Sequence, residues 1–234
     1  MSNIKVITGN IFKSSCQTIV NTVNCIGVMG AGIAWECRLR YPEMFTQYVK
    51  LCEEGLLDIG KLWLYKGTDR WILNFPTKKD WKFPSKESYL RLGLEKFIQT
   101  QEEKRIESVA FPMLGAQNGG FDEERSLSLM QHYLQHCSIP IEIYRYDPKA
   151  PDDLYDNFKA AIQSSTVNDL KLATGLRSNY VKLLKDAVES PRIYQLNQLA
   201  ACKGIGDKTL ETAFDFMRTR GHTEAPKGQG EFSL

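Results

Sequence analysis

Two glycine-rich segments contain the residue types best suited to holding a phosphate group. One is Gly-Ala-Gly-Ile at residues 30–33, and the other is Gly-Ala-Gln-Asn-Gly-Gly at residues 115–120. Glycine lets the backbone approach a ligand closely, and the N–H groups at a helix N-terminus attract anions. Neither segment contains Lys or Arg, and backbone N–H groups in such loops bind anions without one. The two segments therefore predict a phosphate or diphosphate ligand.

Strand-like and helix-like patterns alternate through the first 150 residues. Each glycine-rich segment follows a predicted strand, at 17–24 and 106–114, and precedes a predicted helix, at 33–40 and 123–137. Further strands are predicted at 4–9, 61–67, 70–78 and 141–148, and further helices at 42–55 and 85–105. This alternation predicts an α/β fold with a mixed sheet and helices on both faces. Open α/β sheets bind ligands where strands end and helices begin, so one cleft is expected between the two segments.

The strand-like patterns end near residue 150, and the chain beyond it contains helix-like patterns. We therefore expect one domain at residues 1–150 and a small all-α region at 151–221. Within that region, residues 168–189 form one continuous helix-like segment. The polar, glycine-containing end at 222–234 is expected to be disordered.

Composition excludes several classes of protein. The net charge is +2, so any nucleic-acid contact must be local. The first residues lack the apolar run of a signal peptide, and no stretch approaches the ~20 apolar residues of a membrane span. The six Cys are scattered and His is scarce, so we expect reduced thiols, no metal and no cofactor. A cytoplasmic protein is expected.

Three separated motifs together resemble the macrodomain family, whose members bind ADP-ribose. They are Thr-Gly-Asn-Ile-Phe at 8–12, Val-Asn-Thr-Val-Asn with the first glycine-rich segment at 20–34, and Phe-Pro-Met-Leu with the second at 111–120. The resemblance covers residues 1 to about 147 and implies a three-layer α/β/α fold. The string Asn-Phe-Pro-Thr-Lys-Lys-Asp-Trp at 74–81 is similar to the branch that contains the DarG antitoxins and the vertebrate terminal ADP-ribose glycohydrolase.

The resemblance implies where ADP-ribose would bind. Asn10 stands where macrodomains usually carry an acidic residue that accepts a hydrogen bond from adenine, and the Ile11 N–H would serve the ring; the alternative for Gly9-Asn10 is a simple turn. Asn24 would face the distal ribose, while Asn21 would hold the loop backbone. The implied binding residues are Gly9, Asn10, Ile11, Asn24, Gly30, Ala31, Gly32, Ile33, Gly115, Ala116, Gln117, Asn118, Gly119 and Gly120.

The catalytic aspartates of related hydrolases are missing at the matching positions. Ala31 and Gly119 occupy those positions, and Asp122 is interpreted as a helix N-cap. The resemblance implies instead that Lys78 is catalytic at the distal ribose. Its ammonium would stabilise the leaving oxygen or the ring-opened sugar, or its neutral amine would attack the anomeric carbon. Taken alone, the residue would be interpreted as a solvated surface lysine.

The helical region contains a second pattern with chemical meaning. A turn in this region resembles a helix-hairpin-helix element, which presents backbone N–H groups to a DNA phosphate. Its residues are Lys203, Gly204, Gly206 and Lys208. The alternative is a plain connection in which the glycines cap a helix.

Together these features predict an ADP-ribosyl hydrolase acting on a macromolecule. The DarG resemblance implies removal of ADP-ribose from DNA bases, thymidine above all, and an ADP-ribosyltransferase toxin as partner. The alternatives are a phosphatase of ADP-ribose 1''-phosphate, a hydrolase of O-acetyl- or protein-linked ADP-ribose, and a module that binds ADP-ribose without turnover.

Overall fold

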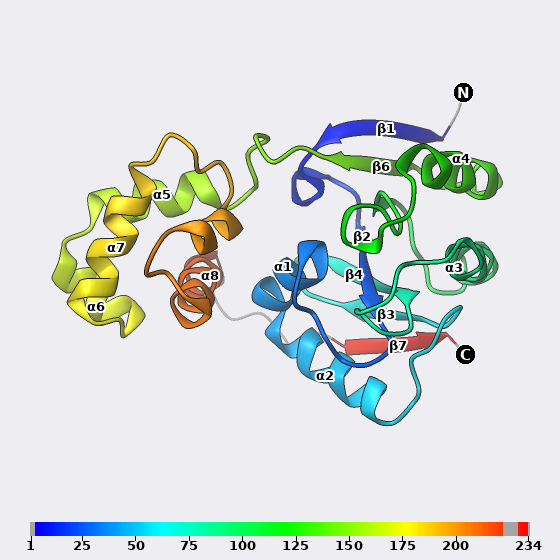
Figure 1. Cartoon of the computed structure of the whole chain (residues 1–234), viewed down its shortest axis with the longest axis horizontal. Helices are drawn as coiled ribbons and strands as arrows, with labels where there is room; N and C mark the ends of the chain where they lie inside the picture. The colour runs from blue at the N-terminus through cyan, green and yellow to red at the C-terminus, as the bar shows by residue number, and fades with distance from the viewer. Residues whose placement is uncertain (1–2, 222–228, 234) are drawn as a thin grey trace. The chain divides into compact units, whose positions relative to one another are not determined.

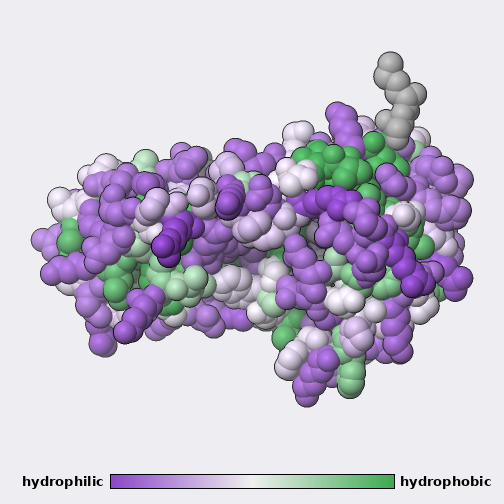
Figure 2. Space-filling view, turned by 45° about the horizontal axis from the view of Figure 1, so that its top comes forward, coloured by the Kyte–Doolittle hydropathy of each residue, from purple (hydrophilic) through white to green (hydrophobic). Residues whose placement is uncertain are grey.

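The computed structural model describes residues 3–221 and 229–233. The chain divides into two compact units (Figure 1). The described residues of unit 1 are 3–146 and 229–233, and unit 2 begins at Asp147. On the face drawn in Figure 2, hydrophilic side chains predominate and hydrophobic ones gather in local patches.

Within the described residues, unit 1 contains one mixed sheet with the strand order β1-β6-β5-β2-β4-β3-β7. Neighbours from β1 to β4 run parallel, whereas β3 runs antiparallel to both β4 and β7. The strands are β1 Ile4–Gly9, β2 Thr18–Asn24, β3 Leu62–Lys66, β4 Trp71–Lys78, β5 Val109–Pro112, β6 Ile141–Tyr146 and β7 Gln229–Ser233. The predicted α/β fold is confirmed, and the predicted strands at 61–67 and 70–78 pair with each other as β3 and β4.

Helices cover both faces of this sheet, which gives the three layers of the macrodomain fold. Helices α1 (Gly32–Arg40) and α2 (Pro42–Glu53) lie on one side, and α3 (Glu87–Thr100) and α4 (Glu123–Leu134) on the other (Figure 1). Each side has its own buried cluster, with Tyr48 and Trp63 in the first and Phe97 and Phe111 in the second. Burying these apolar faces is the main force that fixes the layers and therefore the loops between them.

Close packing in the second cluster depends on a glycine inside α3. A Cβ atom at Gly93 would lie 2.1 Å from Cζ of the buried Phe75 side chain. We expect Gly93→Ala to lower the free energy of unfolding by about 2 kcal/mol, since overpacking outweighs the gain in helix propensity. Urea titration measures this as a lower midpoint. Phe75→Leu in the same chain should restore part of the loss; a Gly93→Ala chain as stable as wild type would refute the close contact.

The C-terminal end differs in part from the prediction of disorder. Residues 229–233 form β7, which pairs with the open edge of β3. The physical reason is that an edge strand leaves a row of N–H and C=O groups that another segment can satisfy. The rest of the predicted tail, 222–228 and 234, lies outside the described residues.

Unit 2 is built from helices, as its sequence pattern predicts. They are α5 Tyr155–Ser164, α6 Val167–Thr174, α7 Ser178–Val188, the short 3-10 helix η3 Leu196–Ala201, and α8 Asp207–Gly221. The prediction of one continuous segment at 168–189 is corrected, because the chain breaks between α6 and α7. Gly175 ends α6 with φ +69°, a conformation that favours glycine and cannot continue a right-handed helix.

No helix in the described ranges is both long and apolar enough to cross a membrane. All six cysteines are free thiols.

Candidate functional site

The central three strands bring the predicted site residues to one edge of the sheet. In the order β5-β2-β4, the first glycine loop follows β2, the second follows β5, and Lys78 ends β4. Asn24 at the end of β2 pairs in register with Lys78, next to a register shift after Val23. Because these strands are parallel, their carboxyl ends meet at the same edge.

The first glycine loop is held by the side chain of Asn24. Its Oδ1 accepts from the N–H groups of Ile26 (3.0 Å) and Val28 (3.3 Å), and its Nδ2 donates to the Val28 carbonyl (2.5 Å). The Tyr48 hydroxyl also donates to the same Oδ1, at 3.1 Å. Asn24 therefore has the loop-holding role that was predicted for Asn21, and that prediction for Asn21 is corrected. The contact of Asn24 with the distal ribose stays a prediction.

Asn21 instead links two strands beneath the loop. Its Nδ2 donates to Oδ1 of Asn74 at 2.9 Å, and both side chains are fully buried. Asn21 Nδ2 also lies 3.9 Å from Sδ of Met29, the last residue before Gly30. The amide pair therefore ties β2 to β4 and contacts the residue that precedes the first glycine loop.

The two glycine loops lie within contact distance. A Cβ atom at Gly32 would lie 2.7 Å from Nδ2 of Asn118 in the second loop. Ala31 is the N-cap of α1 and makes no side-chain cap bond, and the first turn of α1 contains no acidic residue. The N–H groups of that turn, which no helical carbonyl can reach, are therefore suited to an anion.

Lys78 lies against the second glycine loop. Its Nζ donates to the carbonyl oxygen of Asn118, and its Cε lies 3.9 Å from where a Cβ atom of Gly119 would be. Partial burial removes water from the ammonium group and lowers the pKa of Lys78 below its ordinary value. Lys78 is thus not the freely solvated lysine that the bare sequence would suggest.

Ser85 is a site residue that the sequence does not reveal. Its N–H donates to the Gly119 carbonyl at 2.8 Å, and its buried Oγ has no hydrogen-bond partner. A Cβ atom at Gly119 would lie 2.7 Å from that Oγ, and one at Gly115 would lie 3.0 Å from the Ser85 Cβ. The second glycine loop is therefore shaped by Ser85, although nothing in the string Phe-Pro-Ser-Lys signals this role.

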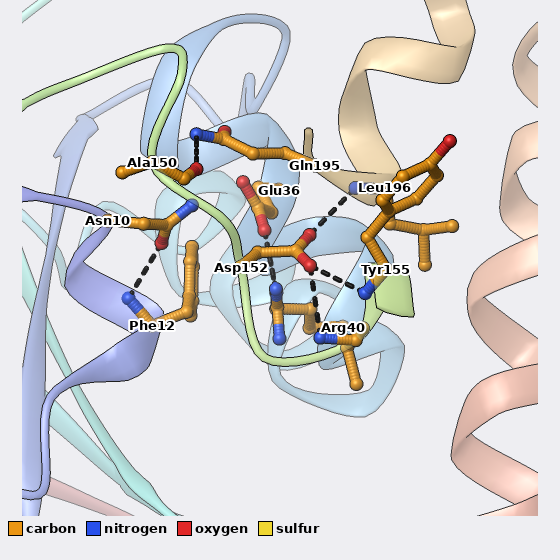
Figure 3. A network of polar contacts seen from close by, with 10 residues as sticks. Asn10, Phe12, Glu36, Arg40, Ala150, Asp152, Tyr155, Gln195 and Leu196 are labelled. Carbon is orange, nitrogen blue, oxygen red and sulfur yellow. Dashed lines mark hydrogen bonds and ion pairs between the residues drawn. The ribbon is translucent and has the colours of Figure 1, made fainter. Parts of the chain in front are cut away.

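The side chain of Asn10 bonds to the backbone of its own turn. It caps the 3-10 helix η1 (Ile11–Lys13), with its Oδ1 accepting from the Phe12 N–H at 2.9 Å (Figure 3). The Asn10 side chain is buried, which favours the turn interpretation over an adenine acceptor. The Phe12 ring lies 3.9 Å from the Arg40 guanidinium carbon, and Arg40 pairs with Glu36 at 2.7 Å, so this turn is fixed against α1.

Asp122 is the N-cap of α4, and its Oδ1 accepts from the Arg125 N–H at 2.7 Å, so that prediction is confirmed. Ala31 and Gly119 carry no carboxylate, and Lys78 is an ionisable residue that contacts the second glycine loop. In the described parts of the chain, no group of three or more His, Cys, Asp or Glu is arranged to hold a metal ion.

Unit 2 has a turn between η3 and α8 at the position where the hairpin was predicted. Gly204 has φ +89°, Ile205 is buried, and the Gly206 carbonyl accepts from the Thr209 and Leu210 N–H groups at the start of α8. Lys203 and Lys208 are exposed.

The turn between α6 and α7 has a similar form. Gly175, with φ +69°, is followed by Leu176 and by Arg177, the N-cap of α7. The sequence pattern does not predict this turn, because the apolar spacing continues from α6 into α7.

The segment leading into unit 2 is part of its fold. Oδ1 of Asp152 accepts from the Tyr155 N–H at 2.6 Å, and Oδ2 accepts from the Leu196 N–H at 2.7 Å. Gln195 donates to the Ala150 carbonyl at 2.7 Å (Figure 3). These contacts join the start of α5 to the start of η3.

Comparisons with known proteins agree with this geometry. The Macro domain family model matches residues 20–130. The chain is 45% identical over 132 residues to a DNA ADP-ribosyl glycohydrolase of Mycobacterium tuberculosis, covering 53% of this chain and 38% of that relative. It therefore spans well under half the length of that curated relative.

Solved structures agree at the level of the domain. The macrodomain of Mycobacterium tuberculosis DarG is 42% identical, with a TM-score of 0.58, and the match covers 60% of this chain and 96% of that one. Thermosipho africanus DarTG in complex with ADP-ribose is 31% identical, with a TM-score of 0.60, over 63% of this chain and 42% of that one. The chain therefore belongs to the macrodomain family, and its macrodomain is of the DarG type.

Proposed function

We propose that the protein is a DNA ADP-ribosyl glycohydrolase that removes ADP-ribose from thymidine bases, with Lys78 as the catalytic residue. The observation that carries the proposal is the position of Lys78, which is partly desolvated and held against the second glycine loop where the first loop also approaches. The similar Mycobacterium tuberculosis protein is a DNA ADP-ribosyl glycohydrolase, which supports this activity.

The substrate would lie along the sheet edge. The adenine would lie against the turn at residues 9–11, and the diphosphate would lie between the two glycine loops, facing backbone N–H groups. The distal ribose would then reach Lys78, Asn118 and Gly119. The binding residues are proposed to be Gly9, Asn10 and Ile11 by backbone contact, Gly30, Ala31, Gly32 and Ile33 in the first loop, and Gly115, Ala116, Gln117, Asn118, Gly119 and Gly120 in the second.

The chemistry suits a lysine in place of a carboxylate. Cleavage of a glycosidic bond to ribose passes through an oxocarbenium-like transition state, in which the leaving base takes the bonding electron pair and a proton. As an ammonium, Lys78 would stabilise the departing group; as a neutral amine, it would attack the anomeric carbon, and water would later release ADP-ribose. Partial desolvation serves the second role, because it lowers the free energy of the neutral amine relative to the ammonium.

A substrate panel tests the reaction class. The panel contains a single DNA strand ADP-ribosylated on thymidine, ADP-ribose 1''-phosphate, O-acetyl-ADP-ribose and an ADP-ribosylated protein. We expect kcat/KM to be highest for the modified strand. If another substrate of the panel is hydrolysed fastest, the enzyme acts on the linkage in that substrate. If the protein binds ADP-ribose but releases no product, it is a binding module without catalytic activity.

The biological setting follows from the same proposal. A glycohydrolase of modified DNA needs a transferase that makes the modification, so we propose an ADP-ribosyltransferase toxin as partner. Six free thiols fit a reducing compartment, and we place the reaction in the cytoplasm.

For unit 2 we propose weak, sequence-independent DNA contact through the hairpin at Lys203, Gly204, Gly206 and Lys208. The similar turn at Gly175 supports a paired arrangement of two such hairpins. The double variant in which both Lys203 and Lys208 are replaced by Glu should bind DNA several-fold more weakly. Its affinity should also depend less steeply on salt concentration, because each phosphate contact contributes to that slope.

This is measured by salt titration of DNA binding, with the exposed Lys149→Glu as the matched charge control. If the Lys203/Lys208 variant and the control have equal DNA affinity and equal salt dependence, the glycines form a plain connection between helices and do not bind DNA.

A further inference from the structure

The turn that connects β4 to α3 holds two aromatic rings in water. Trp81 is 52% exposed and Phe83 is 65% exposed, which makes them the most exposed aromatic side chains in the described part of the chain. Two neighbouring exposed rings leave apolar surface unburied, and such surface marks a place where something binds. We call residues 79–86 the aromatic turn.

The aromatic turn is fixed in position at both ends and in its middle. The Lys79 carbonyl accepts from the Cys25 N–H at 3.1 Å, and the Ser85 N–H donates to Gly119 at 2.8 Å. Between these points, Asp80 accepts from the N–H groups of Lys82 (2.9 Å) and Phe83 (3.2 Å). The backbone that carries the rings is therefore already ordered, which reduces the entropy cost of binding.

The aromatic turn begins immediately after Lys78 and contains Ser85, and both of these residues contact the second glycine loop. The next step rests on the proposed function. If the distal ribose reaches Lys78, the macromolecule bonded to its anomeric carbon must leave the cleft at this point. The polymer would then pass over the aromatic turn.

The charges of the aromatic turn indicate which polymer fits. The aromatic turn contains three lysines, Lys79, Lys82 and Lys86, and one acid, Asp80, whose Oδ1 accepts from the backbone N–H of Lys82. Lys79 forms a long, exposed ion pair with Asp58 at 3.9 Å, which holds its side chain weakly. Lysines interleaved with exposed rings suit a phosphodiester chain whose bases stack on the rings.

We propose that the aromatic turn is a docking surface for single-stranded DNA, in which Trp81 and Phe83 stack on unpaired bases next to the modified nucleotide. Unpaired bases are required because both faces of a base are covered inside a duplex. The lysines would contact the flanking phosphates. This surface extends the proposed substrate from a modified nucleoside to a modified strand.

Two measurements test this surface independently of each other. The first is the Kd for a short, unmodified, dye-labelled oligothymidylate, measured by anisotropy for the wild type, for Trp81→Ala with Phe83→Ala, and for Leu56→Ala. Leu56 is a matched control because it is an exposed apolar residue of unit 1 outside the aromatic turn. We expect the double variant to bind about tenfold or more weakly, since base stacking contributes ~1–3 kcal/mol per ring. The control should be unchanged, and a duplex of the same sequence should show little dependence on the rings.

The second measurement compares hydrolysis of two substrates, the ADP-ribosylated strand and ADP-ribosyl-thymidine alone. The double variant should show a raised KM for the strand and unchanged kinetics on the nucleoside. An unchanged oligothymidylate Kd in the double variant would overturn the proposed docking surface. Ring-dependent strand binding without cleavage of either substrate would support the surface and refute the proposed glycohydrolase.

Discussion

Replacing Lys78 with alanine should abolish release of ADP-ribose from modified DNA, with a loss of about 100-fold or more in single-turnover rate. ADP-ribose affinity should stay within about threefold of wild type, since the backbone of the two loops supplies most proposed contacts to the diphosphate. The Nζ of Lys78 donates to the Asn118 carbonyl in the structure. The expected pattern is therefore lost chemistry with retained binding, measured by product release and by calorimetric titration with ADP-ribose.

The matched control for this variant is Lys50→Ala. Lys50 is a lysine of α2 whose side chain is 73% exposed and which pairs with Glu54 at 3.8 Å, so its removal should change neither rate nor affinity. Wild-type rates in Lys78→Ala would show that another group carries the reaction.

The pH dependence of the wild-type rate should report the same residue. Burial lowers the pKa of Lys78, so the ionisation that controls kcat/KM should lie below the range of a solvated lysine. A neutral attacking amine gives a rate that rises as pH passes through this pKa, and a stabilising ammonium gives a rate that falls. Lys78→Arg, which keeps the charge but cannot attack, should be inactive in the first case and partly active in the second.

Gly119→Ala should weaken ADP-ribose binding by about tenfold or more, because a new Cβ atom has no room at this position. It would lie 2.7 Å from the Ser85 Oγ and 3.4 Å from the Ser85 Cβ, so the second glycine loop must shift. The shift would also move the Asn118 carbonyl that Lys78 holds. We therefore expect a loss of both affinity and rate, measured by the same titration and assay.

A second substitution makes this prediction specific to the contact. Ser85→Ala removes the Oγ, so adding it to Gly119→Ala should recover most of the affinity, while Ser85→Ala alone changes little. For the ADP-ribose titration, Gly206→Ala is the control for an added methyl group, because Gly206 lies outside the proposed ADP-ribose site and has no atom within 4 Å of the new Cβ. Failure of the double variant to recover would mean that the steric contact with Ser85 is not what shapes the loop.

The sequence predicts the parts of this site that depend on pattern and motif. The alternation of strands and helices predicts the layers, the glycine spacing predicts both loops, and Asp122 before an apolar helical pattern predicts the cap of α4. Each of these signals is local in the chain, and the local preference agrees with the final fold.

The sequence does not predict contacts that depend on how loops approach in space. Asn24 holds the loop backbone in place of Asn21, and Asn21 bonds to Asn74, because an amide side chain bonds whichever polar groups the fold presents to it. Ser85 gives no signal, since its role comes from packing against Gly119, which is far away in the chain. The break at Gly175 is hidden because the apolar spacing continues on both sides of it.

The most direct test of the central claim is a single-turnover reaction of the wild-type protein with a short DNA strand ADP-ribosylated on thymidine, with products identified by mass. The expected result is free ADP-ribose and an unmodified strand, with both products absent when Lys78→Ala is used. An intact modified strand that remains bound to the wild-type protein would contradict the account and identify the cleft as a site of recognition alone.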